Sequence, residues 1–443
     1  MSGSASRAAP WRCPPTTGSP TSRSTGTTTD RWLPGEGGLP PVRVSSPVQS
    51  VSGDPGTRVV ASPGHLAAAG LTAIAVSFAF ARYGYGLFLP QFREAFALST
   101  EAAGLLAAAG YAAYLLALVV TGAVVSRTGP RLLVVVGTSA ATLGTAMVAA
   151  APNALVLAIG VCVAATSPGG CWAPFSDAVA RQVPPDRQHR TLSVITSGTT
   201  FGVLVSAPVA WLTGAASTWR LAWAGFAVVA LISAVWNALL VAGGPDPRRT
   251  DAPAGASPWR WLRRTGSAPL LLGSAGFGLT STVYWTYAVD RVAGAPTMPD
   301  VAAPVFWVLV GGSGILGTAT GSLVAAGGLR RTLVVTSLAL GLASAVMVLP
   351  PSWASVASSA VLFGSSFMVL SALLVIWSGE VFPERPATGF SAALCALALG
   401  AIAGLPLLGG YADARGLPAM FAVNAVLALP MLLLRPRFAR PSP

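Results

Sequence analysis

The stretch Gly122–Arg131 reads GAVVSRTGPR, and the stretch Gly321–Arg330 reads GSLVAAGGLR. Both glycines and the final arginine of the first stretch recur in the second at a constant offset of 199 residues. A second block repeats at an offset of 198, in which Pro185, Arg187, Gly202 and Pro208 correspond to Pro383, Arg385, Gly400 and Pro406. Two independent blocks with nearly the same offset indicate that half of the chain is duplicated.

The composition excludes an ordinary soluble protein. Charged residues make up 9% of the 443 residues, against about 25% in soluble domains, and the mean hydropathy is +0.66. A net charge of +13 would suit a nucleic-acid binder if it were clustered. Here the arginines are spread between apolar runs, so we expect no nucleic-acid partner. All 27 basic residues are arginine, which is typical of a GC-rich bacterial genome.

The apolar runs predict a membrane protein with twelve spanning helices. A span needs about 20 apolar residues, and in lipid each run must be helical because every backbone group has to be paired within its own segment. The predicted spans are 66–90, 102–125, 132–151, 154–176, 191–214, 221–242, 267–289, 302–326, 332–350, 354–377, 387–408 and 418–434.

The repeat divides these spans into two halves of six. Because six is even, both halves have the same orientation, and parallel halves suit a transporter with its site at their interface. We predict a disordered tail over residues 1–64, a first half over 65–242, a cytoplasmic linker over 243–265, a second half over 266–435 and a cytoplasmic tail over 436–443. The polar composition of residues 1–64 cannot support a core. A translation start near Val59 or Val60 is the alternative for that tail.

The arginine distribution predicts the orientation in the cytoplasmic membrane. With the N-terminus inside, cytoplasmic loops and flanks hold seventeen arginines and outer loops hold four, namely Arg93, Arg220, Arg291 and Arg415. Cytoplasmic loops carry an excess of basic residues. We therefore expect both termini in the cytoplasm.

The stretch Gly122–Arg131 resembles the signature between helices 2 and 3 of the major facilitator superfamily, G-x-x-x-D-R-x-G-R-R. Gly122, Arg127, Gly129 and Arg131 match it, whereas Ser126 replaces the signature Asp. The resemblance implies a twelve-helix fold and a cytoplasmic gate in which charges pair. Asp177 ends the fourth span, and we expect Arg127 or Arg131 to be its partner.

A narrower resemblance concerns the first span. The stretch Phe80–Pro90 reads FARYGYGLFLP, which is similar to the R-F-x-Y-G-x-x-x-P stretch of YbfB/YjiJ-like, cyanate-permease-like members. The fifth span, with Gly198, Gly202 and Pro208, resembles the antiporter signature of the superfamily and favours efflux over uptake. Close helix packing with a proline kink explains the same residues equally simply.

Arg82 is the only arginine well inside a predicted span, about eight residues before Pro90. An intramembrane arginine is costly unless it faces a cavity or a partner. We interpret it as an anion-binding or gating residue, and a structural arginine that pairs locally is the alternative. Further aromatic and hydroxyl residues suited to line a central cavity are Tyr83, Tyr85, Tyr111, Tyr114, Tyr284, Thr286, Tyr287 and Trp307.

Proton coupling would need a titratable group in the membrane, and the candidates are Asp290 and Glu380 at helix ends. Ion pairing at the surface is the alternative role for both acids. Coupling to protons is therefore implied by the resemblance alone, and uniport stays possible.

The sequence thus predicts a monomeric secondary transporter that moves a small molecule by alternating access. The alternative is a membrane sensor or scaffold that uses the same fold without transport. The sequence contains no clustered catalytic constellation, no Cys/His metal spacing and, lacking lysine, no phosphate-binding G-x-x-x-x-G-K-[ST] loop. We therefore expect no enzymatic activity, no cofactor and no metal.

Overall fold

A computed structural model describes residues 63–213, 218–244, 266–383 and 386–436, which all belong to one compact unit, Arg58–Pro443. The predicted N-terminal tail lies outside the described residues except for its last two positions. The predicted linker does so beyond Gly244, and the C-terminal tail beyond Pro436.

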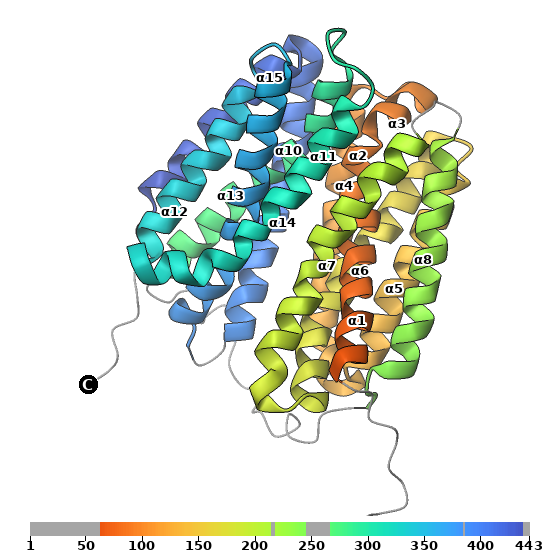
Figure 1. Cartoon of the computed structure of the whole chain (residues 1–443), viewed down its shortest axis with the longest axis vertical. Helices are drawn as coiled ribbons and strands as arrows, with labels where there is room; N and C mark the ends of the chain where they lie inside the picture. Colours follow the sequence, from red (N-terminus) through yellow and green to blue (C-terminus); the bar gives the residue numbers. More distant parts are fainter. Residues whose placement is uncertain (1–62, 214–217, 245–265, 384–385, 437–443) are drawn as a thin grey trace, which may run out of the picture. The chain divides into compact units, whose positions relative to one another are not determined.

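The first half begins with a broken helix and continues with five helices (Figure 1). The first predicted span comprises α1 (Pro63–Ile74), a π-helical segment η1 (Ala75–Tyr83) and α2 (Gly84–Leu87), and α3 (Leu89–Phe96) follows it. The remaining spans are α4 (Thr100–Thr128), α5 (Pro130–Ala149), α6 (Ala154–Gln182), α7 (Pro185–Leu212) and α8 (Trp219–Leu240).

The second half is also built from helices, and its helices are broken at other places than those of the first half. Its elements are α10 (Ser267–Ala293), α11 (Ala302–Ser313), η2 (Gly314–Ala319), α12 (Thr320–Val346), α13 (Trp353–Val381), α14 (Pro386–Arg415), α15 (Leu417–Leu427) and η3 (Leu429–Leu433). The described residues contain helices and no strand, which confirms the all-helical membrane fold.

Nine helices in the described part of the chain are long and apolar enough to cross a membrane, and one of them, Ala302–Val346, covers two predicted spans. The helix over Leu417–Leu433 is apolar but shorter. The predicted seventh span, α10, is outside the nine and carries many buried hydroxyl groups. Thr280, Ser281 and Thr282 each donate a hydrogen bond to the carbonyl oxygen four residues earlier. A polar helix of this kind suits the interior of a bundle rather than the lipid face.

Gly129 and Gly328, which the repeat pairs, have the same backbone conformation. Their φ angles are 74° and 76°, a left-handed region that glycine enters at no steric cost. Gly129 ends α4, and Gly328 forms a kink inside α12. The kink separates the predicted eighth and ninth spans, so the duplication extends to the geometry of both loops.

The two halves meet mainly along α4 and α14, with further contacts between α7 and α11 and between α10 and both α2 and α3. Glycines allow this close approach. A Cβ atom at Gly86 would lie 2.0 Å from the Trp285 carbonyl oxygen, and one at Gly104 would lie 2.5 Å from the Leu405 carbonyl oxygen. Backbone therefore packs directly on backbone between the halves.

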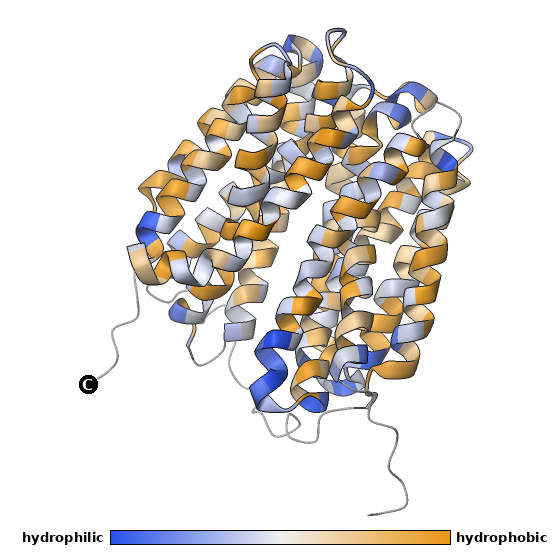
Figure 2. Cartoon of the chain, viewed as in Figure 1, coloured by the Kyte–Doolittle hydropathy of each residue, from blue (hydrophilic) through white to orange (hydrophobic). Residues whose placement is uncertain are grey.

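Hydrophobic residues make up most of the helices, and hydrophilic residues gather near helix ends (Figure 2). Leu116, Leu212 and Leu239 are 66%, 76% and 75% exposed. Large exposed apolar side chains on helices of this length and hydropathy suit contact with lipid.

Candidate functional site

Arg82 lies at the end of the π-helical segment η1, inside the first span. π-Helical turns are rare and are found frequently at functional sites. The guanidinium carbon of Arg82 lies 4.1 Å from the ring centre of Tyr114 and 4.4 Å from that of Tyr111. These tyrosines are three residues apart on α4, so they share one helix face. Both rings stabilise the cation through their π faces.

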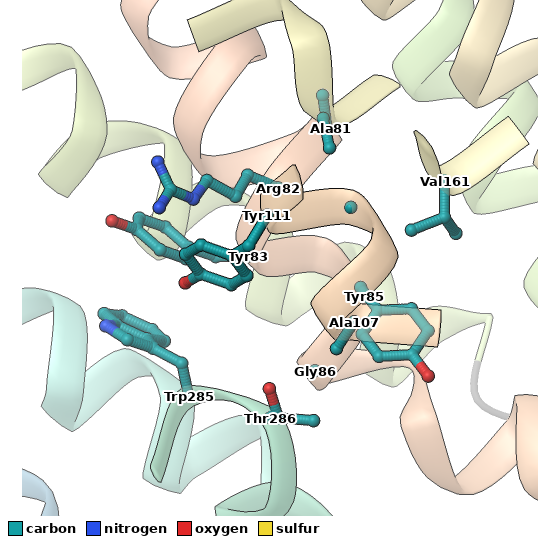
Figure 3. Close-up of a pocket in the computed structure, with 12 residues that line it drawn as sticks. Ala81, Arg82, Tyr83, Tyr85, Gly86, Ala107, Tyr111, Val161, Trp285 and Thr286 are labelled. Carbon is teal, nitrogen blue, oxygen red and sulfur yellow. The ribbon is translucent and has the colours of Figure 1, made fainter. Parts of the chain in front are cut away.

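A small cavity adjoins Arg82 (Figure 3). Its volume is about 30 Å³, which is room for a water molecule and not for an organic solute. The residues that line it are Ala81, Arg82, Tyr83, Tyr85, Gly86, Ala107, Gly110, Tyr111, Val161, Ala165, Trp285 and Thr286. The first half contributes most of this lining, and α10 of the second half contributes Trp285 and Thr286.

Aromatic rings from both halves meet beside this cavity. Tyr83 stacks on Trp285 with ring centres 4.3 Å apart and an angle of 12° between the planes. Trp285 in turn packs edge-on against Trp307, at 5.0 Å, and against Phe367, at 5.3 Å. The Trp307 indole N–H donates a hydrogen bond to the Ser206 hydroxyl of α7. The cavity therefore lies at the interface of the two halves.

The structure brings most of the predicted cavity residues together. The cavity lining includes Arg82, Tyr85, Tyr111 and Thr286. Tyr114 packs on Arg82, and Trp307 packs on Trp285, which also lines the cavity. Tyr85 also donates a hydrogen bond to the Ala103 carbonyl oxygen.

Tyr284 lies elsewhere. It stacks on Phe363 at 3.8 Å and shares a hydrogen bond of 2.6 Å with Ser359, so its contacts are those of the core of the second half. Sequence reasoning missed Trp285. It lies four residues before the predicted end of its span, where an interfacial tryptophan is equally expected, so no signal distinguished it.

Arg82 has no acidic partner among the described residues. The ion pairs there are Arg93–Asp290 and Arg187–Asp186. The neighbours of the Arg82 guanidinium include the rings of Tyr83, Tyr111 and Tyr114. Within the described residues, the positive charge of Arg82 therefore lies against aromatic rings and has no ion-pair partner. Within the same residues, no three potential metal ligands cluster.

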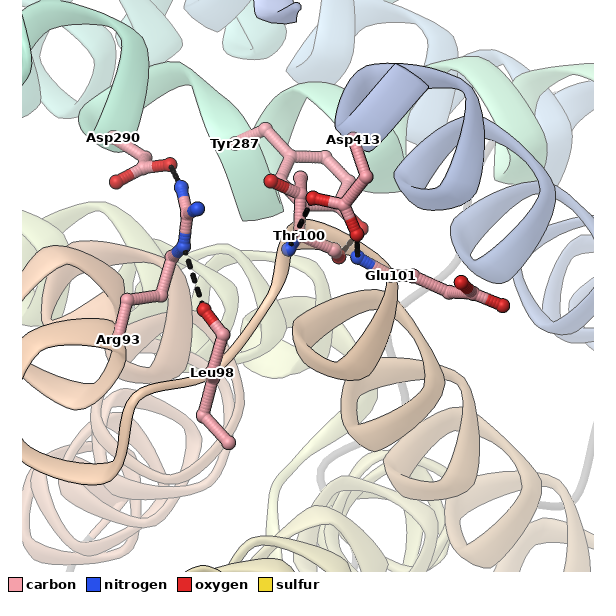
Figure 4. A network of polar contacts seen from close by, with 7 residues as sticks. All are labelled: Arg93, Leu98, Thr100, Glu101, Tyr287, Asp290 and Asp413. Atoms are coloured by element: carbon pink, nitrogen blue, oxygen red, sulfur yellow. Dashed lines mark hydrogen bonds and ion pairs between the residues drawn. The ribbon is translucent and has the colours of Figure 1, made fainter.

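A polar network joins the halves at one end of the bundle (Figure 4). Arg93 of α3 forms an ion pair with Asp290 of α10, and its Nε–H donates to the Leu98 carbonyl oxygen. The Asp413 carboxylate of α14 accepts hydrogen bonds of 2.8 Å from the backbone N–H groups of Thr100 and Glu101. Asp413 thus caps the N-terminus of α4 from the other half.

Tyr287 adds to this network. Its hydroxyl donates to the carbonyl oxygen of Thr100 at 3.1 Å, a bond shared with the Leu405 carbonyl oxygen at 3.2 Å. We call Arg93, Asp290, Asp413 and Tyr287 the polar clasp. Of the predicted proton carriers, Asp290 is therefore buried in an ion pair, whereas Glu380 is exposed at the end of α13.

The predicted gate motif lies at the opposite end of α4. Gly129 packs against the segment that follows α8, because a Cβ atom there would lie 2.0 Å from the Gly244 carbonyl oxygen. Arg181 donates a hydrogen bond to the same oxygen. Arg127, Arg131 and Gly122 are exposed and Asp177 is partly buried. The pairing of Asp177 with either arginine stays a prediction.

Long apolar helices that form a bundle around a small cavity are the architecture of a polytopic membrane transporter. The sequence model of the Major Facilitator Superfamily matches residues 71–386, and the chain belongs to this superfamily.

One further similarity is to a protein whose name describes a regulatory role. The chain is 25% identical over 297 residues to the transcription regulatory protein OpdE of Pseudomonas aeruginosa, covering 66% of this chain and 73% of that one.

Among solved structures, a mutant of the nucleoside transporter NupG is similar with a TM-score of 0.71 and 11% identity, covering 83% of this chain and 98% of that one. A bacterial homologue of the human lysosomal transporter Spinster, in an inward-facing, unoccupied conformation, gives 0.70 and 15%, covering 86% and 97%. A POT family transporter bound to 5-aminolevulinic acid gives 0.68 and 14%, covering 82% and 94%. At these identities the likeness concerns the fold.

Proposed function

We propose that this protein is a secondary transporter of the cytoplasmic membrane that moves a small molecule by alternating access. The observation that carries the proposal is the position of Arg82. It lies at the interface of the two halves, next to a cavity whose lining comes from both. A site built from two halves changes its exposure when the halves rock against each other.

The polar clasp supports a state of the transport cycle in which the outer side is closed. The hydrogen bonds and the ion pair that join the halves within the described residues involve Arg93, Thr100, Glu101 and Ser206 of the first half. All four lie in the parts of their helices that the arginine distribution assigns to the outside. We infer that the clasp is an outer gate, here closed, and that the gate motif around Gly129 faces the cytoplasm.

Finer features follow from the sequence. We propose that the protein belongs to the YbfB/YjiJ-like branch, works as a monomer, has both termini in the cytoplasm and couples efflux to protons. The outward-assigned Asp290 is the better proton candidate of the two, because it is buried against Arg93, whereas Glu380 is exposed. Uptake and uniport are the alternatives.

A regulatory role is the second candidate function. The name of OpdE describes a transcription regulatory protein, and this relative shares 25% identity with the chain. A membrane sensor would bind its ligand and change state without moving it across the membrane.

Locking the outer gate tests the transport proposal. The cysteine pair Glu101→Cys with Gly410→Cys suits a reversible lock, because a Cβ atom at Gly410 would lie 3.8 Å from the Glu101 Cγ atom. The full chain is reconstituted in liposomes and offered nucleosides, amino acids and organic acids, with and without a pH gradient. We expect saturable flux of one solute class that stops on oxidation and returns on reduction. Binding without flux in the unlocked protein would contradict transport and favour the sensor.

A further inference from the structure

The charge of Arg82 sets the requirement for a ligand. In the described part of the chain it forms no ion pair, and the rings of Tyr111 and Tyr114 lie against it. Ring faces stabilise the cation, but a guanidinium directs its five N–H donors outward in its own plane. Neutral hydroxyl groups leave the charge uncompensated. An anion that enters the cavity would neutralise the charge of Arg82 and accept hydrogen bonds from its guanidinium.

The chemistry of the site selects the kind of anion. A guanidinium matches a carboxylate with two parallel hydrogen bonds. A phosphate monoester carries about 1.5 to 2 negative charges at neutral pH, and the cavity lining contains a single cation, Arg82. Arg93 does not supply a second one, because it is paired with Asp290. The site therefore suits a monocarboxylate.

The neighbouring rings select the body of the ligand. Tyr83, adjacent to Arg82, stacks on Trp285 of the other half, and Trp307 and Phe367 surround that indole. The cavity of about 30 Å³ is too small for an organic acid, so binding needs the halves to separate. Separation would part Tyr83 from Trp285 and leave two parallel ring faces, between which a flat ring can stack.

We propose that the transported solute is an aromatic monocarboxylate, with its carboxylate on Arg82 and its ring between Tyr83 and Trp285. The proposal rests on the transport function argued above and adds the substrate class.

Calorimetric titration of the purified full-length chain with four probes tests the class directly. Benzoate has the proposed charge and shape, benzamide lacks the charge, cyclohexanecarboxylate lacks the flat ring, and phenyl phosphate carries excess charge. We expect benzoate to bind at least about tenfold more tightly than each of the others. Binding of benzamide as tight as that of benzoate, or no binding of benzoate, would overturn the proposal.

Two substitutions assign the binding to the named groups. Arg82→Lys should weaken benzoate binding about tenfold, because lysine lacks the planar fork, and Arg82→Gln should abolish it. Arg220→Gln is the matched control, since Arg220 also packs on an aromatic ring, that of Trp219, but lies outside the cavity lining. Trp285→Leu should remove the preference for benzoate over cyclohexanecarboxylate, whereas Trp353→Leu, at an exposed tryptophan, should keep it.

Benzoate binding that is unchanged in both Arg82 variants would also overturn the proposal. If those variants do not fold, the ratio of benzoate to benzamide affinity in the unaltered chain decides. The liposome assay distinguishes a failure of the transport function from a failure of the ligand assignment. Benzoate binding without flux would leave the ligand assignment standing and contradict transport. Flux of a neutral solute, with no benzoate binding, would support transport and overturn the ligand assignment.

Discussion

Arg93 in the first half forms an ion pair with Asp290 in the second half, 197 residues further along the chain. Both groups lie largely out of water, with side-chain exposures of 29% and 11%. The pair connects α3 to α10 at the end of the bundle where the polar clasp joins the halves. Its loss should therefore affect both the stability of the closed state and access to the cavity.

We predict that Asp290→Asn lowers the stability of the protein by about 1–3 kcal/mol. Removal of one partner leaves the other charge unpaired, which costs about 3–5 kcal/mol when burial is complete and less here because Arg93 keeps contact with solvent. Thermal unfolding in detergent, followed by intrinsic fluorescence, measures the change. Arg187→Gln is the control, because its ion pair with Asp186 is exposed at 67% and 73% and should contribute less than about 0.5 kcal/mol. Equal effects at the two pairs would contradict the prediction.

Asp413→Ala should loosen the first turn of α4. The carboxylate satisfies two backbone N–H groups that have no partner within the helix, and loss of such a cap costs about 0.5–2 kcal/mol. Hydrogen exchange of the Thr100 and Glu101 amides should accelerate by about tenfold, since 1.4 kcal/mol corresponds to a factor of ten. The amide of Val156, capped by Asn153 in a separate loop, should keep its rate. Unchanged exchange at Thr100 would show that the cap is dispensable.

Gly86→Ala should disrupt the interface between the halves. The new Cβ atom would lie 2.0 Å from the Trp285 carbonyl oxygen, and overpacking of this kind costs about 1–3 kcal/mol. Gly122→Ala is the matched control, because no heavy atom outside its own helix lies within 4 Å of the added Cβ atom. Alanine at that helical position should be neutral or stabilise by up to about 1 kcal/mol. A stability loss at Gly122 equal to that at Gly86 would sink this explanation.

Gly129→Ala and Gly328→Ala compare the same backbone conformation in two surroundings. Each variant places a side chain at a φ angle near 75° with ψ of 173° or 158°, a conformation that costs about 1–3 kcal/mol for residues other than glycine. At Gly129 the Cβ atom would also lie 2.0 Å from the Gly244 carbonyl oxygen, whereas the space around Gly328 is open. We therefore expect the larger drop in melting temperature for Gly129→Ala. The opposite order would contradict this reading of the loop.

Sequence patterns located the spans well, and the first span shows what they missed. The apolar runs and the duplicated Gly122–Arg131 block located the twelve segments and the break at Gly328. The first span was predicted as one continuous helix over 66–90, and it is instead broken at Phe88, after a π-helical segment. Nothing in the local composition signals the π-helical turn, since the same residues suit an α-helix.

The candidate site was only partly predictable. Arg82 stood out because a charge in a span is costly. Tyr111 and Tyr114 both pack on its guanidinium, because residues three apart on α4 lie on the same helix face. Tyr284 and Trp285 are neighbours in sequence, yet the first packs into the core of the second half and the second stacks on Tyr83. A helix in a membrane bundle is apolar on nearly all sides, so periodicity does not say which face meets the other half.

The sequence by itself determined the number, length and twofold repetition of the helices, because lipid accepts only long apolar segments with their backbone paired internally. It also paired Gly129 with Gly328, whose positive φ angles the structure then showed. Only the tertiary structure decided that Arg93 pairs with Asp290, that Asp413 caps α4 and that Tyr83 meets Trp285. These contacts join residues far apart in the chain, and they exist only where the docking of the two halves brings the helix faces together.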